Sequence, residues 1–284
     1  MSALGPATAA TRRDRPTQTG LGLGDDDVHV WRADLDRPAR PLAQLTWWLS
    51  ADERLRAEGF VFLRDRRRFI VARGMLRLLL AAYLNCEPEA ISLRSGHNGK
   101  PELALDSGHP PVRFNHSRSQ GGAVYAVTRG RRVGVDLEAL RPIPDAEQIA
   151  ERWFSPREQA ALAALPSELR NAAFLRGWTS KEAYAKAIGE GLAADLDRIE
   201  VELASTEPPA LRAIDDDPAE AARWSLQALP TSPGYVAALV VEVHGYRLDC
   251  RSPLPCAATK AFKIETRATA IHFGGPAHVC PEGT

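Results

Sequence analysis

Two acidic residues in one short segment have the spacing of a metal site. Asp136 and Glu138 are two residues apart in the stretch from Arg131 to Glu138, which has the pattern of a β-strand. Side chains at positions i and i+2 of a strand project from the same face, so both carboxylates point in one direction. A third carboxylate, Glu182, follows farther along the chain. Because carboxylate oxygens are preferred ligands of Mg²⁺, the three together predict a magnesium site that could also take Mn²⁺.

A lysine stands beside the third carboxylate. Glu182 and Lys186 are four residues apart, so on a helix they share one face, and a lysine next to a metal site suits a phosphate-bearing substrate. Simpler interpretations stay open. Asp136 and Glu138 could lie on a solvated strand face, and Thr179 with Glu182 matches a capping box. Glu182 and Lys186 could form a surface ion pair worth only ~0.3–0.5 kcal/mol.

Arginines are concentrated between residues 64 and 77. Arg66, Arg73 and Arg77 have spacings that place them on one helix face, which would form a stripe suited to phosphate. The alternatives are a solvated helix face or a nucleic-acid-binding surface. The formal net charge of zero and the lack of aromatic residues among these arginines argue against nucleic acid as a partner.

Composition is that of an ordinary globular protein. The 284 residues are 44% hydrophobic and 25% charged, enough for one large domain or two smaller ones. The four cysteines (Cys86, Cys250, Cys256 and Cys280) form no C-x-x-C pair, which favours reduced thiols. No apolar run approaches the ~18 residues of a membrane span, and no secretory segment is evident. We therefore expect a cytoplasmic protein with no membrane partner.

The pattern of elements predicts an α+β fold made of two similar α/β subdomains. Capping boxes begin helices at Ser50 and Ser155, and long helices are expected over 64–84 and 167–188, the second with a break left open near Gly177. Strands are expected at 28–31, 112–115, 123–127, 199–203, 224–228 and 235–243, with a polar loop at 116–122. The expected division is a disordered leader (1–24), an N-terminal subdomain (25–130), a C-terminal subdomain (131–246) and a loosely ordered tail (247–284).

Several motifs occur together in a characteristic order. They are Arg68 to Leu80, Gly99-Lys100-Pro101, Phe114-Asn115-His116-Ser117-Arg118-Ser119, Gly134-Val135-Asp136-Leu137-Glu138, Trp153-Phe154-Ser155, and the run from Trp178 to Leu192. In this combination the chain resembles a 4′-phosphopantetheinyl transferase of the surfactin-synthetase-activating (Sfp-like) class. The resemblance covers roughly residues 28–245.

The resemblance implies a pseudo-dimer of two halves with coenzyme A, the substrate, bound in the cleft between them. It implies that Asp136, Glu138 and Glu182 bind Mg²⁺ and that Lys186 is catalytic. Glu182 is also the favoured proton acceptor from the attacking serine, although which carboxylate is the base stays open. The segment 141–165 falls where the family contacts the acyl or peptidyl carrier protein. The residues that fall in regions holding coenzyme A phosphates are Arg68, Arg73, Arg77 and Lys100.

One position departs from the family pattern. Arg118 occupies the place of a phosphate-contacting histidine, and His116 lies two residues earlier on the same side of an extended segment. Arginine can bind a phosphate bidentately without titrating. Both residues are therefore predicted to contact coenzyme A, and a monomeric transferase is the expected form. A nucleic-acid-binding protein, another Mg²⁺-dependent nucleotide enzyme and an inactive carrier-binding relative are the weaker alternatives.

Overall fold

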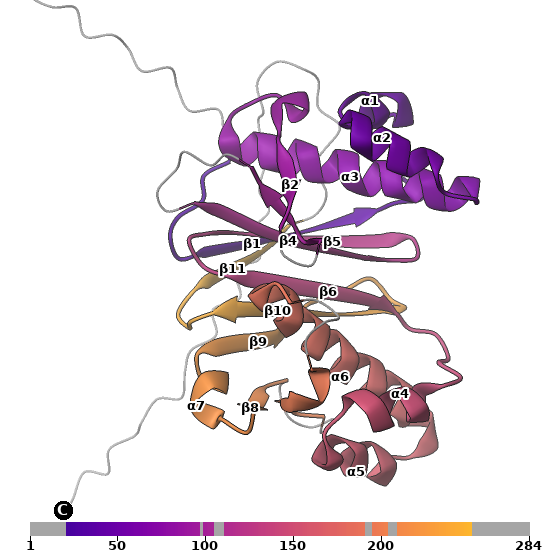
Figure 1. Cartoon of the computed structure of the whole chain (residues 1–284), viewed down its shortest axis with the longest axis vertical. Helices are drawn as coiled ribbons and strands as arrows, with labels where there is room; N and C mark the ends of the chain where they lie inside the picture. Colours follow the sequence, from indigo (N-terminus) through magenta and orange to yellow (C-terminus); the bar gives the residue numbers. More distant parts are fainter. Residues whose placement is uncertain (1–20, 97–98, 105–110, 191–194, 204–208, 252–284) are drawn as a thin grey trace, which may run out of the picture.

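Two β-sheets lie face to face at the centre of the protein, and each is covered on its outer side by helices (Figure 1). This arrangement comes from a computed structural model that describes residues 21–96, 99–104, 111–190, 195–203 and 209–251. One apolar core fills the space between the first sheet and its helices, a second fills the matching space in the other half, and a third joins the sheets. The expected mixture of helices and strands is therefore confirmed.

The first half of the chain forms the sheet β1-β5-β4, and strand β11 (Arg247–Arg251), which follows the second half, extends it to the order β11-β1-β5-β4. Only β11 is parallel to its neighbour, and the other pairs are antiparallel. A short 3₁₀ turn, η1 (Pro88–Ala90), and a small hairpin lie between the helices and the last two strands. The elements are β1 (Asp27–Asp34), α1 (Leu42–Trp47), α2 (Ala51–Glu58), α3 (Leu63–Leu84), β2 (Leu93–Ser95), β3 (Pro101–Leu103), β4 (Val112–Ser119) and β5 (Gly122–Arg129).

The second half repeats this order of elements and forms the antiparallel sheet β6-β10-β9. Its long helix α6 has 22 residues, as does α3. A 3₁₀ turn, η4 (Leu196–Arg198), and a small hairpin again precede the last two strands. The elements are β6 (Val133–Ala139), α4 (Ala146–Trp153), α5 (Pro156–Ala164), α6 (Ser167–Ile188), β7 (Ile199–Val201), β8 (Leu211–Ile214), α7 (Pro218–Ala221), β9 (Trp224–Ala228) and β10 (Tyr235–Glu242).

Alternation along β6 decides where its acidic residues point. Val133, Val135 and Leu137 lie in the core between the two sheets. The intervening residues Gly134, Asp136 and Glu138 must face the opposite side, because successive strand side chains alternate. That side is covered by α6, since a side chain at position 134 would meet the backbone of this helix. The strand therefore directs both of its carboxylates toward the helix that carries Glu182 and Lys186.

Two expectations about local structure are wrong, and the break left open near Gly177 is absent. Residues 116–119 are not loop but the second half of β4, and only Gln120 and Gly121 form the turn. The helix α6 is unbroken at Gly177, which packs closely against side chains of Leu203 and Phe154. The tail is not loosely ordered from its start, because β11 (Arg247–Arg251) pairs with β1.

The predicted leader also begins to fold earlier than expected. Leu23 is buried, and the backbone N–H of Leu21 donates to the carbonyl of Ala82 at the end of α3. Residues 1–20 and 252–284 lie outside the described part of the chain. Among the described residues, no helix combines the length and apolar character required to cross a membrane.

Candidate active site

Gly134 allows the strand β6 and the helix α6 to approach each other closely. A Cβ atom at this position would lie 2.0 Å from the carbonyl oxygen of Ala183 and 2.4 Å from the backbone nitrogen of Ala187. Only glycine can occupy such a contact without moving the helix. Ala183 and Ala187 directly follow Glu182 and Lys186, so this contact fixes how near those two side chains come to the strand.

Lys186 and Asp136 meet across this contact. The Lys186 Nζ atom lies 2.5 Å from Asp136 Oδ1 and 3.1 Å from the Ser117 hydroxyl oxygen. The Ser117 hydroxyl in turn donates to Asp136 Oδ1 over 2.7 Å. Asp136 is 3% exposed, so its charge is held by the lysine and the serine in a site largely shielded from water.

Glu138 is held in the same manner from β4. The Ser119 hydroxyl donates to Glu138 Oε2 over 2.8 Å, and its oxygen accepts the backbone N–H of Ala139. Burial raises the pKa of Glu138, and the negative charge of Asp136 adds to this rise, whereas the hydrogen bond from Ser119 opposes it. The two carboxylates therefore interact electrostatically, and each accepts a hydrogen bond from a different serine of β4.

Glu182 completes a group of acidic side chains with too little positive charge nearby. Burial, with the charges of Asp136 and Glu138, raises the pKa of Glu182 to about 7 against the opposing charge of Lys186. Within the described residues, Glu182 Oε1 and Asp136 Oδ2 are both buried and accept no hydrogen bond. Buried carboxylate oxygens without a donor are costly, so these two atoms are chemically suited to a cation.

The three carboxylates do not, however, form a closed ligand set. In the described part of the chain, no three His, Cys, Asp or Glu side chains converge closely enough to hold a metal ion between them. The ammonium group of Lys186 instead lies against Asp136. The structure thus brings the predicted metal ligands into one electrostatic cluster without bringing them into coordination geometry.

A second cluster of predicted residues lies on the opposite face of β4. His116 and Arg118 share that face, as expected for alternate residues of a strand. His116 stacks on Tyr125, and burial, together with the charges of Arg73, Lys186 and Arg118, lowers its pKa to about 3. The guanidinium of Arg118 lies over the rings of Phe60 and Phe69. His116 is therefore neutral at physiological pH, and Arg118 is the permanent cation on this face of the strand.

The three predicted arginines of α3 have different surroundings. Arg68 makes a bidentate ion pair with Asp36 at the surface. Arg73 lies 3.3 Å from Glu53, and its Nη1 atom is buried with no hydrogen-bond partner among the described residues. Arg77 is 3% exposed and donates to Glu53 and to the carbonyls of Pro88 and Ile91. These donors serve the fold, which argues against the phosphate contact predicted for Arg77.

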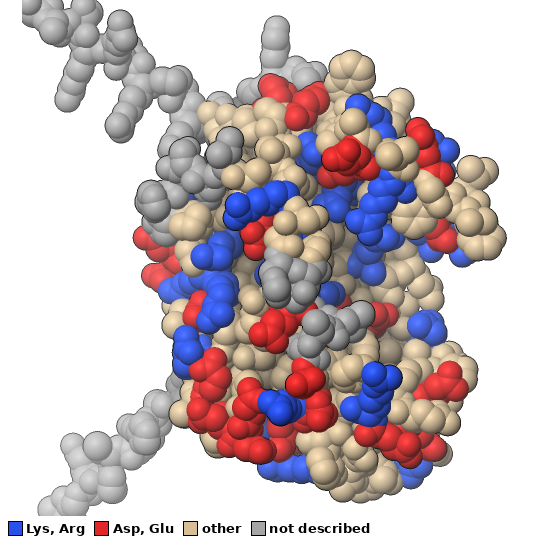
Figure 2. Space-filling view, in the orientation of Figure 1, with Lys and Arg blue, Asp and Glu red and all other residues tan. Residues whose placement is uncertain are grey.

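Lys100, beside the small hairpin of the first half, contacts α6, the helix that carries Glu182 and Lys186. Its Nζ atom donates to the carbonyl oxygen of Lys186 over 2.5 Å, and burial lowers its pKa to about 8. Lys100 also lines a cavity of about 420 Å³ at the junction of the two halves, together with Arg94, Arg113 and Arg132. Figure 2 shows Lys and Arg atoms gathered over the middle and upper part of this face, whereas Asp and Glu dominate its lower edge.

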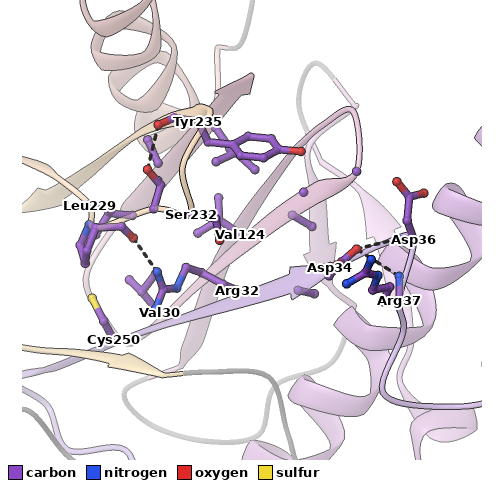
Figure 3. A pocket seen from close by; sticks show the side chains of 18 residues that line it. Val30, Arg32, Asp34, Asp36, Arg37, Val124, Leu229, Ser232, Tyr235 and Cys250 are labelled. Carbon is purple, nitrogen blue, oxygen red and sulfur yellow. Dashed lines mark hydrogen bonds between the residues drawn. The ribbon is translucent and has the colours of Figure 1, made fainter. Parts of the chain in front are cut away.

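A larger cavity of about 580 Å³ opens between the two sheets on another side (Figure 3). Val30 and Val124 belong to its apolar lining, and Arg32, which donates to the carbonyl of Pro230, lies at its edge with Tyr235. None of the predicted site residues lines it. It is therefore a separate hollow from the acidic cluster.

The sequence interpretation gave no role to three residues that build the site. Ser117 and Ser119 hold the carboxylates, and Gly134 sets the distance between strand and helix. All three were part of quoted motifs. The available signal was the alternation of Asn115, Ser117 and Ser119 with the larger His116 and Arg118, which is hidden when that stretch is interpreted as loop.

Comparison with known proteins gives consistent matches. Residues 132–240 match the family model described as the 4′-phosphopantetheinyl transferase superfamily, and residues 37–130 match the model for the N-terminal part of 4′-phosphopantetheinyl transferases. The 4′-phosphopantetheinyl transferase HetI of Nostoc sp. is 42% identical over 232 residues, which are 82% of this chain and 94% of that protein.

More distant relatives belong to the same group. The 4′-phosphopantetheinyl transferase psf-1 of Bacillus pumilus is 32% identical over 72% of this chain and 84% of its own length. The human L-aminoadipate-semialdehyde dehydrogenase-phosphopantetheinyl transferase is 34% identical over 55% of this chain and 53% of its own length. Among solved structures, a holo-(acyl-carrier-protein) synthase from Bacillus anthracis, in complex with coenzyme A, matches with 24% identity and a TM-score of 0.31, over 39% of this chain and 96% of that one.

Proposed function

Because the chain belongs to the 4′-phosphopantetheinyl transferase family, we propose that it transfers the 4′-phosphopantetheine arm of coenzyme A to a serine of an acyl or peptidyl carrier protein and releases 3′,5′-ADP. The observation that carries this proposal is the meeting of Lys186, Asp136 and Glu182 where β6 touches α6. A lysine and several carboxylates at one point suit the handling of a phosphorylated substrate with a divalent cation.

Asp136, Glu138 and Glu182 would hold Mg²⁺, or Mn²⁺ in its place. Their chemistry fits, because all three offer hard oxygen donors and two of them have a buried oxygen without a hydrogen bond in the described part of the chain. The bound ion would supply positive charge that neutralises the phosphates of coenzyme A. The raised pKa of Glu182 supports the same assignment, since it reflects a buried carboxylate that lies close to Asp136 and Glu138.

Lys186 would stabilise charge on the phosphoryl oxygens during transfer, because its ammonium group is fixed by Asp136 and Ser117 and costs little to orient. Glu182 is the best candidate for the base that takes the proton from the carrier serine. A general base works most efficiently when its pKa is close to the working pH, and the pKa of Glu182 is about 7.

Coenzyme A phosphates would be held by cations on the first half. Arg118 and Arg73 lie on the same side of β4 as the neutral side chain of His116. Lys100 donates to the carbonyl oxygen of Lys186, near the end of α6. Arg68 is a further candidate at the surface, although binding there must compete with Asp36. Arg77 is left out of the proposed set because it is buried and paired.

We further propose that the two halves, 25–130 and 131–246, form a pseudo-dimer with the substrate cleft between them. The repeated order of elements and the basic cavity at their junction support this arrangement. The segment 141–165 would contact the carrier protein. A monomer in a reducing, cytoplasmic compartment is the proposed form.

The direct test is incubation with coenzyme A, Mg²⁺ and a panel of apo carrier proteins, with mass spectrometry of the carriers. We expect at least one carrier to gain a phosphopantetheine arm in a reaction abolished by chelation of the metal. If the folded protein modifies no carrier in the panel, the proposal is refuted.

A further inference from the structure

Three consecutive apolar side chains project into solvent where α3 begins. Val61 is 88% exposed, Phe62 67% and Leu63 80%, and we call these three residues the apolar ridge. Leu55, on the preceding helix α2, is also 70% exposed. Runs of exposed apolar residues are unfavourable in water and are characteristic of interaction surfaces. The right-hand end of the upper half in Figure 2, where α3 starts, is correspondingly rich in uncharged atoms.

The ridge is connected to the acidic cluster by a short series of contacts. Phe60, immediately before it, packs against Phe69 with ring centroids 5.3 Å apart. The Arg118 guanidinium lies over both rings, at 5.9 and 5.8 Å from their centroids. Arg118 is followed on β4 by Ser119, whose hydroxyl holds Glu138. Although Arg118 and Ser119 project from opposite faces of β4, these contacts connect the ridge to the end of the strand that holds Glu138.

The residues that flank the ridge are mainly basic. Arg56, Arg64 and Arg67 are exposed around it. The side chain of Arg64 is 70% exposed, and its Nε atom lies 3.6 Å from Oδ1 of its acidic neighbour Asp65. A complementary partner would present apolar side chains bordered by acidic groups. Such charges across an interface mainly increase the rate of association and make it sensitive to salt.

We propose that the apolar ridge is a docking surface for the apo carrier protein on the N-terminal half. This inference rests on the proposed function, since a transferase that modifies a protein serine must seat that protein at the rim of its cleft. The ridge lies at the rim formed by the first half, and it would hold the carrier from that side. The partner it fits is a small folded protein with an acidic, apolar-centred face.

The test compares the ridge with an exposed apolar residue elsewhere. The ridge variant combines Val61→Thr, Phe62→Ser and Leu63→Gln. Phe62 is the N-cap of α3 and makes no capping hydrogen bond, so serine there should preserve or improve the helix start. The control is Val243→Thr, which is 45% exposed just beyond the end of β10 farthest from Glu138.

Binding of an apo acyl carrier protein is measured by calorimetry, and turnover is measured with the same carrier. We expect the ridge variant to bind the carrier about tenfold more weakly or worse, with a matching rise in its KM. The KM for coenzyme A and the kcat at saturating carrier should stay within about twofold of the native values, and the control should behave as the native protein does.

Unchanged carrier affinity in the ridge variant would overturn the inference while leaving the transferase activity intact. Two other results would also overturn it. One is ridge-dependent binding to phosphatidylserine vesicles with no effect on the carrier. The other is loss of a native dimer, measured by sedimentation, with no effect on the carrier. Failure of the native enzyme to modify any carrier it binds would instead refute the proposed function.

Discussion

Replacement of Gly134 by alanine is the sharpest test of how the site is built. The added Cβ atom would lie 2.0 Å from the Ala183 carbonyl oxygen, whereas ordinary contacts begin at 3.4 Å. The three nearest atoms, the Ala183 oxygen and the Ala187 nitrogen and Cα, all belong to the backbone of α6, so no side chain can rotate away. The strand and the helix must therefore separate by about 1.4 Å, the difference between the two distances.

Such a displacement should affect activity more than folding. Overpacking of a core typically costs about 1–3 kcal/mol, which a protein of this size should tolerate. A displacement of about 1 Å at reacting groups, in contrast, can lower the rate about 100-fold. Because Glu182 and Lys186 move with the helix while Asp136 stays on the strand, we expect kcat/KM to fall by at least that factor.

The assay measures carrier modification and urea unfolding for Gly134→Ala beside Gly177→Ala. Gly177 lies on the same helix, but a Cβ atom there would meet the side chains of Leu203 and Phe154, not a backbone. This control should lose stability with little loss of rate. If Gly134→Ala retains more than about a third of native activity, the close approach of strand and helix is not what positions the site.

Three further predictions concern charge. The pKa of Glu182 is raised from 4.5 to about 7, so the free energy of unfolding should fall as pH rises through that window. At pH 8, Glu182→Gln should be up to ~3 kcal/mol more stable than the native protein in metal-free urea unfolding. Equal pH profiles for the two proteins would contradict this. Lys181→Met and Glu158→Gln should each lower the free energy of unfolding by ~3–5 kcal/mol, because each leaves its buried partner unpaired. The double variant should lose less than the sum of the two, which a double-mutant cycle would measure. Arg118→Ala should weaken coenzyme A binding by ~1.5–3 kcal/mol in calorimetry, with no titration at this position in the native protein between pH 6 and 8; an effect of His116→Ala in its place would reverse the two roles.

Much of the fold could be predicted from the sequence because its signals are local. The helix over 64–84 is confirmed within one residue, and both capping boxes are present, at Ser50 and at Ser155. Strand β6 is confirmed, with its two carboxylates on one face. These features depend on neighbouring residues only, so periodicity and capping chemistry are sufficient to find them.

The errors arose where distant contacts decide the structure. The stretch 116–119 is polar, yet it is a strand because its backbone pairs with β5, and its Ser117 and Ser119 side chains hydrogen-bond to carboxylates of β6. Residues after 246 looked unstructured, yet β11 forms because β1 offers a free edge. Neither partner is visible from the local sequence, since tertiary contacts outweigh local propensity.

The surroundings of Arg77 in the first half are repeated around Lys181 in the second half, which indicates a structural role for Arg77 and not the phosphate contact predicted from its charge. The capping-box residue Glu53 pairs with Arg77 over 2.6 Å, and Arg77 donates to the carbonyls of Pro88 and Ile91 at the turn η1. In the second half, the capping-box residue Glu158 pairs with Lys181, also over 2.6 Å.

Lys181 then donates to the carbonyls of Leu196 and Ile199 at the turn η4. The step from residue 77 to 181 is 104 positions, and so is the step between the two left-handed C-caps, from Asn85 to Gly189. The same anchor thus fixes each long helix to its own half. We infer that Arg77 and Lys181 are equivalent structural cations, which leaves Lys186, paired with Asp136 at the acidic cluster, as the lysine of the motif proposed to act on substrate.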